Sequence, residues 1–140
     1  MKKKSITDAF VKVIKKSTMK KFSVSLTDIF NEKKYHYILI IKSTTEKCVR
    51  ITIYPLEDKQ IVKLKLRDIP DIFFNNLSDI LKKYDVIHSS GLLEIDGQLF
   101  YECYLKIDIE SPKIIELKKI LDKVKNSSTL FSIEKIKFLK

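Results

Sequence analysis

The chain has 140 residues, 33% of them charged, and a formal net charge of +10. This length fits one domain, or one domain with an appendage, and can bury roughly two-thirds of the unfolded surface. Two glycines, two cysteines and two histidines argue against a glycine-rich phosphate loop, a disulfide framework and a zinc-type ligand set. No apolar run approaches the roughly 18 residues of a membrane span. We therefore expect a cytoplasmic protein with no metal, no cofactor and no membrane span.

The positive charge is concentrated at the N-terminus. Residues 1–21 hold eight lysines and one acid, a net charge of +7, and the rest of the chain is nearly neutral. Ile6, Phe10, Val13 and Ile14 share one helical face, which predicts a basic amphipathic helix over residues 1–20. Its candidate contact surface consists of Lys2, Lys3, Lys4, Lys12, Lys15, Lys16, Lys20 and Lys21.

A basic amphipathic helix has three candidate partners. It can dock on its own protein or dimer, follow a phosphate backbone, or rest on an anionic membrane. Docking leads because charge runs are commonly the solvated faces of ordinary helices. Phe22–Leu26 has a strand pattern where a helix-turn-helix would need its second helix, so nucleic acid is the less favoured partner.

Residues 21–58 contain three β-rich runs, separated by loops of hairpin length. The runs are Phe22 to Phe30, Tyr35 to Lys42 and Cys48 to Tyr54. We predict an antiparallel meander that packs with the rest of the chain. It either extends the following sheet or forms a separate layer.

Residues 59–140 form the third predicted region. Val62, Leu64 and Leu66 alternate with lysines, which predicts a strand, and the apolar residues from Pro70 to Tyr84 recur at helical spacing. Asp96-Gly97 joins the runs 86–95 and 98–107, and this pair predicts a type I′ hairpin turn because both central residues need positive φ.

The last helix is predicted to begin at Ser111-Pro112 and to continue to about Lys125. The tail from Leu130 to Leu139 fits either a strand or a helix, and we choose a strand because a βαβ unit needs a closing partner. The order from residue 60 onward is then βαββαβ. The predicted fold class is an α+β, ferredoxin-like βαββαβ sandwich, preceded by the basic helix and the meander.

The same element order occurs in RNA-recognition modules, where aromatic side chains on the sheet stack on bases. Here the hairpin strand reads Leu99-Phe100-Tyr101-Glu102-Cys103-Tyr104. A glutamate stands where contact with phosphate or base favours a neutral or positive side chain, so RNA binding by the sheet is the weaker interpretation.

The turn Asp68-Ile69-Pro70-Asp71 resembles the Asp-x-Pro-Gly turn of ACT domains, which are small regulatory modules, with Asp71 in place of glycine. The resemblance covers residues 61–138. It implies a homodimer with a site for an amino acid or small polar metabolite at the dimer interface. By position, that site maps onto Asp68, Ile69, Pro70, Asp71, Ile72, Ser89 and Ser90. Helix capping and strand-end solvation explain the same residues in purely local terms.

No constellation in the sequence predicts catalysis. His88 has no sequence partner for a catalytic set, and Cys103 is expected to be a buried, inert thiol. We therefore expect a non-enzymatic module that binds an amino acid or similar metabolite and acts on a protein partner. The alternative is a protein-interaction or nucleic-acid-binding module that acts through the lysine-rich helix, with its ligand site lost. Steep salt dependence would distinguish phosphate binding from binding of a small ligand.

Overall fold

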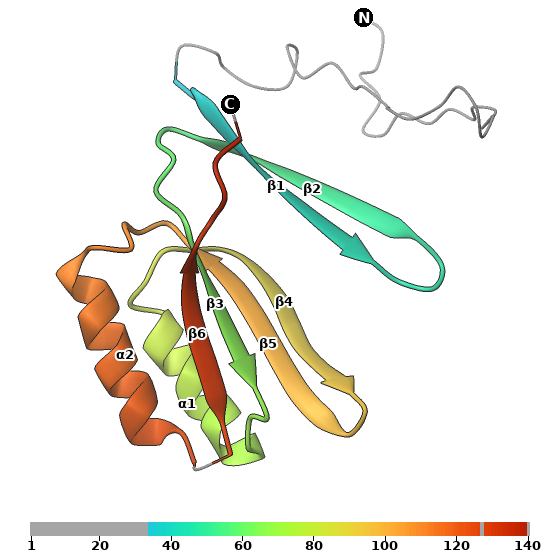
Figure 1. The fold of residues 1–140 in the computed structure, drawn as a ribbon, viewed down its shortest axis with the longest axis vertical. Coiled ribbons are helices and arrows are strands. Elements are labelled where there is room, and N and C mark those ends of the chain that lie inside the picture. The colour runs from blue at the N-terminus through green and yellow to red at the C-terminus, as the bar shows by residue number, and fades with distance from the viewer. Residues whose placement is uncertain (1–33, 127, 140) are drawn as a thin grey trace, which may run out of the picture.

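The computed structural model describes residues 34–126 and 128–139. Its elements, in chain order, are β1 (Tyr37–Thr44), β2 (Val49–Leu56), β3 (Val62–Arg67), α1 (Asp71–Leu81), β4 (Val86–Ile95), β5 (Gln98–Leu105), α2 (Pro112–Val124) and β6 (Leu130–Lys135) (Figure 1).

The described strands form two sheets. β1 and β2 form a two-stranded antiparallel hairpin, and the other four strands form a sheet in the order β4-β5-β3-β6 (Figure 1). Every pairing in the larger sheet is antiparallel, and β3 is central, with Leu64 opposite both Cys103 and Ile133. Both helices lie against the same face of this sheet.

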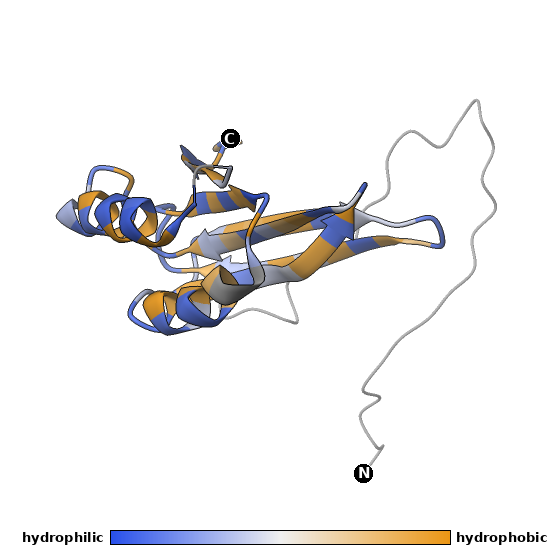
Figure 2. Ribbon diagram, turned by 90° about the horizontal axis from the view of Figure 1, so that it is seen from below, coloured by the Kyte–Doolittle hydropathy of each residue, from blue (hydrophilic) through white to orange (hydrophobic). Residues whose placement is uncertain are grey.

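The main core lies between the four-stranded sheet and the two helices. Strand alternation directs Val62, Leu64 and Leu66 toward the helices, and hydrophobic and hydrophilic residues accordingly alternate along the strands (Figure 2). From the helices, Leu77 and Leu117 are at most 1% exposed. The remaining buried members of this core are Ile69, Phe73, Leu81, Tyr101, Cys103, Leu105, Ile114 and Leu121.

A second, smaller core lies under the hairpin. Leu39, Ile41 and Leu56 of the hairpin pack with Ile61, and Tyr104 and Ile136 lie against this group from the larger sheet and its C-terminal tail. The hairpin therefore rests on the opposite side of the sheet from the helices, near one end of its strands.

The predicted fold class is wrong for the described chain. We expected an α+β, ferredoxin-like βαββαβ sandwich, whereas the described residues are mostly β, with two sheets and two helices. The physical reason lies in residues 37–56, which form a sheet of their own with a separate core instead of extending the larger sheet.

Several local predictions are confirmed. The runs 35–42 and 48–54 are the antiparallel strands β1 and β2, and the tail is the strand β6 followed by irregular chain. The Asp96-Gly97 turn has φ of 52° and 78°. The basic helix over 1–20, its eight lysines and the first run of the meander lie outside the described residues.

Candidate functional site

A cavity of about 510 Å³ opens between α1 and the edge strand β4. This volume falls within the range of small-molecule sites in proteins. Its floor is apolar and consists of Phe74, Leu77, Leu81, Val86 and Tyr101. Four polar side chains surround this floor. Lys82 and Asp85 carry opposite charges, and Ser78 and Ser89 are neutral.

Irregular pairing between β4 and β5 shapes one wall of the cavity. The register shifts twice, between Val86 and His88 and between Ser89 and Leu92. Gly91 has φ of +72°, a conformation that side-chain-bearing residues seldom adopt, and no atom lies within 4 Å of where its Cβ would be. Backbone conformation, rather than space, therefore explains a glycine at this position.

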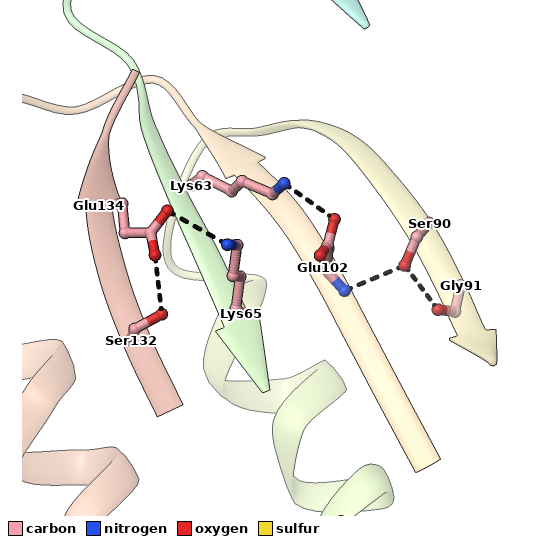
Figure 3. A network of polar contacts seen from close by, with 7 residues as sticks. All are labelled: Lys63, Lys65, Ser90, Gly91, Glu102, Ser132 and Glu134. Carbon is pink, nitrogen blue, oxygen red and sulfur yellow. Dashed lines mark hydrogen bonds and ion pairs between the residues drawn. The ribbon is translucent and has the colours of Figure 1, made fainter. Parts of the chain in front are cut away.

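Two serines hold this irregular segment. Ser89 Oγ accepts a hydrogen bond from the Gly91 N–H at 3.1 Å. Ser90 Oγ donates to the Gly91 carbonyl at 2.8 Å and accepts from the Glu102 N–H at 3.0 Å (Figure 3). Ser89 also lines the cavity, whereas Ser90 does not.

Tyr101 forms the back of the cavity. It is 8% exposed, and its ring meets the Phe74 ring edge to face at a centroid distance of 6.4 Å. Burial raises the pKa of Tyr101, Cys103 adds to the rise, and a hydrogen bond with Ser89 opposes it. The phenol is therefore neutral at physiological pH and can both donate and accept a hydrogen bond.

The charged groups of the cavity are exposed. Lys82 Nζ lies 3.4 Å from Asp79 Oδ1, but the two side chains are 74% and 78% exposed, so the pair is weak and leaves Lys82 able to reorient. Asp85 is also exposed, and its carbonyl accepts a hydrogen bond from the Lys106 N–H at 2.9 Å. The cavity thus offers one cation and one anion beside an apolar floor.

Asp68, the first residue of the predicted turn before α1, does not line the α1–β4 cavity. Asp68 has φ of 58°, and its N–H donates to the Leu99 carbonyl at 2.8 Å. Its carbonyl lies 3.0 Å from Thr129 Oγ1, which is buried and also lies 2.7 Å from Asn126 Oδ1. These contacts join the ends of β3 and β5 to the segment before β6, which is a structural role.

Ile69 and Pro70 also do not line the cavity. Ile69 is 3% exposed in the main core, and the Pro70 carbonyl accepts the Phe73 N–H at 3.0 Å. Asp71 and Ile72 begin α1. Asp68, Ile69 and Pro70 do not line the α1–β4 cavity, so the structure does not bring these three residues together with Ser89.

The sheet face opposite the helices carries paired charges. Lys63 Nζ lies 3.0 Å from Glu102 Oε2, and Lys65 Nζ lies 3.4 Å from Glu134 Oε2 (Figure 3). Burial lowers the pKa of Lys63, but the hydrogen bond with Glu102 and the neighbouring Tyr104 and Glu102 groups outweigh it, so the pKa is raised. Charges that are matched within the face leave little net potential for a polyanion.

Sequence reasoning missed one contact that joins the two sheets. Tyr54 of the hairpin places its hydroxyl oxygen 2.8 Å from Nδ1 of His88 on β4, and the His88 ring also lies against Tyr104. Nothing in the local pattern pairs residues 34 positions apart. His88 therefore contacts aromatic side chains in a part-buried position, and the sequence alone gave it no partner.

Two further groups bear on chemistry. Cys103 is fully buried, and burial raises its pKa to about 12, so its thiolate is scarce at physiological pH. Within residues 34–126 and 128–139, no group of three or more His, Cys, Asp and Glu side chains could hold a metal ion. No helix in the described part of the chain is long and apolar enough to cross a membrane.

Comparison with protein-family models, curated proteins and solved structures finds no match to this chain. The resemblance to ACT domains therefore remains a prediction from the sequence.

Proposed function

We propose that this chain is a non-enzymatic, cytoplasmic binding module that takes an amino acid or similar small polar metabolite in the α1–β4 cavity. The observation that carries the proposal is the combination of an apolar floor with Lys82 and Asp85 at a cavity of about 510 Å³. Few, well-placed polar groups around an apolar wall are typical of small-molecule sites.

The two charges favour a ligand that carries both signs. The Lys82 ammonium would meet a ligand carboxylate, and the Asp85 carboxylate would meet an ammonium group. The Ser89 hydroxyl can accept or donate a further hydrogen bond. An aliphatic or aromatic side chain of the ligand would lie on the floor against Phe74 and Tyr101.

A bound ligand would act on the two elements that line the cavity, α1 and β4. It is lined by the C-terminal half of α1 and by the irregular part of β4, so an occupied cavity would fix these two elements relative to each other. A partner protein that contacts either element would then bind the two states with different affinity, which is the requirement for regulation by a ligand.

Isothermal titration against the standard amino acids, at fixed pH and salt, tests the proposal. We expect one amino acid or a small related group to bind, and Lys82→Ala to weaken it by about tenfold or more, because hydrogen bonds to charged groups contribute roughly 1.5–3 kcal/mol. Lys83→Ala is the matched control, since Lys83 is the next residue, is exposed and does not line the cavity.

The outcomes are distinguishable. Binding that is lost in Lys82→Ala and kept in Lys83→Ala supports the cavity. An equal loss in both variants would place the ligand elsewhere, and binding abolished only by Asp68→Ala would favour the predicted turn. If no amino acid or small related metabolite binds to the wild-type protein, the proposal fails.

The hairpin favours a second candidate, a protein-interaction module that forms a homodimer. Ile38, Ile40, Val49 and Ile51 lie on the hairpin face turned away from the second core and are 42–57% exposed. Contiguous exposed aliphatic side chains often mark an interaction surface. If a second copy covers this face, Ile40→Lys converts a dimer to a monomer in sedimentation velocity, and a wild-type monomer would reject the candidate.

A further inference from the structure

A second cavity lies between the hairpin and the C-terminal tail. This hairpin–tail cavity has a volume of about 500 Å³, close to that of the α1–β4 cavity, and the two share no lining residue. Its walls come from residues 36–40 at the start of β1, from the end of β2 and the segment after it, and from residues 136–139. Figure 1 shows this tail leaving β6 and running toward the start of β1. The cavity can therefore hold a ligand of its own.

The base of the hairpin–tail cavity is apolar and buried. Leu39, Leu56 and Ile61 line it and are 4–6% exposed. Phe138 also lines it and is 48% exposed, although its ring meets the Tyr37 ring edge to face at a centroid distance of 5.9 Å. A hydrocarbon chain laid across this base would cover the accessible part of the Phe138 ring. Removal of such surface from water favours binding.

The charged side chains described at this cavity are all basic. Lys59 and Lys137 line it together with His36, and none of the described lining residues is acidic. Lys59 Nζ lies 4.9 Å from the centroid of the Phe138 ring, which places this ammonium group beside the apolar wall. Within residues 34–126 and 128–139, neither lysine forms an ion pair. The α1–β4 cavity, by contrast, carries both charge signs.

The acidic residues that precede Lys59 in the chain make other contacts. Asp58 Oδ1 accepts a hydrogen bond from the Gln60 N–H at 3.0 Å. Glu57 Oε1 lies 3.7 Å from Lys34 Nζ. Neither acid lines the hairpin–tail cavity. The two lysines therefore give the cavity a positive local potential, which fits an anionic group beside an apolar body.

We propose that the hairpin–tail cavity binds a single-chain amphiphile with an anionic head group, of the fatty-acid type. The hydrocarbon chain lies on the apolar base around Leu39 and Ile61, and the carboxylate meets the ammonium groups of Lys59 and Lys137. The imidazole of His36 can donate a further hydrogen bond. A zwitterionic amino acid fits less well, because no described lining residue offers a carboxylate to its ammonium group. The ligand class therefore differs from the one proposed for the α1–β4 cavity.

Isothermal titration of the full chain with octanoate, decanoate and dodecanoate, each at concentrations where it is monomeric, tests the apolar part. We expect one ligand per chain and about fourfold tighter binding for each added methylene, because burial of one CH₂ contributes about 0.8 kcal/mol. Phe138→Ala should weaken decanoate binding by about fourfold or more, because it removes apolar wall surface. Leu93→Ala is the matched control, since Leu93 is 49% exposed on β4 and does not line the cavity.

The head group and the lysines are tested in the same assay. Decanoate should bind about tenfold more tightly than decanol, and decyltrimethylammonium should bind more weakly than either, because like charges repel. Lys59→Gln and Lys137→Gln should each weaken decanoate binding by about threefold and together by about tenfold, since single exposed ion pairs are weak. Decanol binding should not change. Lys42→Gln is the control, because Lys42 is exposed on the same hairpin and does not line the cavity.

The outcomes separate the two cavities and the other occupants. Loss of affinity in the lysine variants and in Phe138→Ala, with none in Lys42→Gln or Leu93→Ala, supports the proposal. Equal affinity for decanoate and decanol would overturn it, because the lysines would then take no part in recognition. Loss of decanoate binding in Lys82→Ala would place the ligand in the α1–β4 cavity instead. If no carboxylate of the series binds the wild-type chain, as when another part of the protein fills the cavity, the proposal is also overturned.

Discussion

The hydroxyl of Tyr54 and Nδ1 of His88 lie 2.8 Å apart and connect the two sheets of this protein. Tyr54 belongs to the hairpin, and His88 lies on the edge strand of the larger sheet. The rings also meet edge to face, at a centroid distance of 5.6 Å. This contact and the small core around Leu39 and Ile61 set how the hairpin rests on the rest of the chain.

Tyr54→Phe should reduce the free energy of unfolding by about 0.5–1.5 kcal/mol, because it removes this hydrogen bond and leaves the ring in place. Urea denaturation measures the loss as a lower midpoint with an unchanged slope. Tyr37→Phe is the control, since it removes a hydroxyl from the same hairpin without touching His88. A double-mutant cycle with His88→Ala should return a coupling of similar size, and a coupling near zero would mean that the contact does not stabilise the fold.

Replacement of Asp96 and Gly97 by alanine should destabilise the β4–β5 hairpin. Both residues have positive φ, and this conformation costs side-chain-bearing residues roughly 1–2 kcal/mol. Aspartate tolerates it better than alanine does, so most of the loss should come from Gly97→Ala, with a smaller part from Asp96→Ala. Thermal unfolding of the single and double variants separates the two parts, and an unchanged melting temperature would contradict the type I′ turn.

Local patterns were enough to predict the elements of the larger sheet. Alternation at Val62–Leu66, helical spacing after Pro70 and the Asp96-Gly97 turn each depend on residues close in sequence. The fold class was wrong because alternation in Tyr37–Ile41 shows that one face is buried but does not show what covers it. Leu39 and Ile41 pack in a second core, and the hairpin stays separate from the larger sheet.

The cavity was harder to predict than the elements. Ser89 was selected as a strand-end contact, but Lys82, Asp85 and Tyr101 come from other positions and meet it only through the packing of α1 on β4. The register shifts that shape β4 coincide with Gly91 and with a hydrogen bond from the Glu102 N–H to Ser90 Oγ, twelve residues earlier in the chain. Such long-range pairing leaves no periodic signal in the sequence.

Two apolar positions on α2, two residues apart, should differ in their response to truncation. Leu117 is fully buried, and Leu117→Ala should cost roughly 2–5 kcal/mol of unfolding free energy because it removes packed atoms and leaves a cavity. Ile115 is 57% exposed, and Ile115→Ala should change stability by less than about 0.5 kcal/mol. Chemical denaturation of the two variants makes the comparison. Equal effects would mean that α2 presents a different face to the sheet.

Stability should fall with alkaline pH through the buried thiol. Burial raises the pKa of Cys103 from 9.0 to about 12, so between these values the folded state holds a proton that the unfolded state releases. The contribution is fully present below pH 9 and is lost as pH rises toward 12. Each pH unit in this window should remove up to about 1.4 kcal/mol relative to Cys103→Val, which has no thiol.

Lys63 and Tyr101 also have raised pKa values, and the stability that each contributes to the folded state is likewise lost as pH rises. Cys103→Val keeps both groups but removes the contribution of Cys103 to the raised pKa of Tyr101, so the comparison measures the thiol together with this coupling. Urea midpoints measured from pH 8 to pH 10.5 should diverge above pH 9, with the wild type falling faster. Parallel curves would show that Cys103 ionises equally easily in the folded and unfolded chains, and would contradict its burial against α1 and α2.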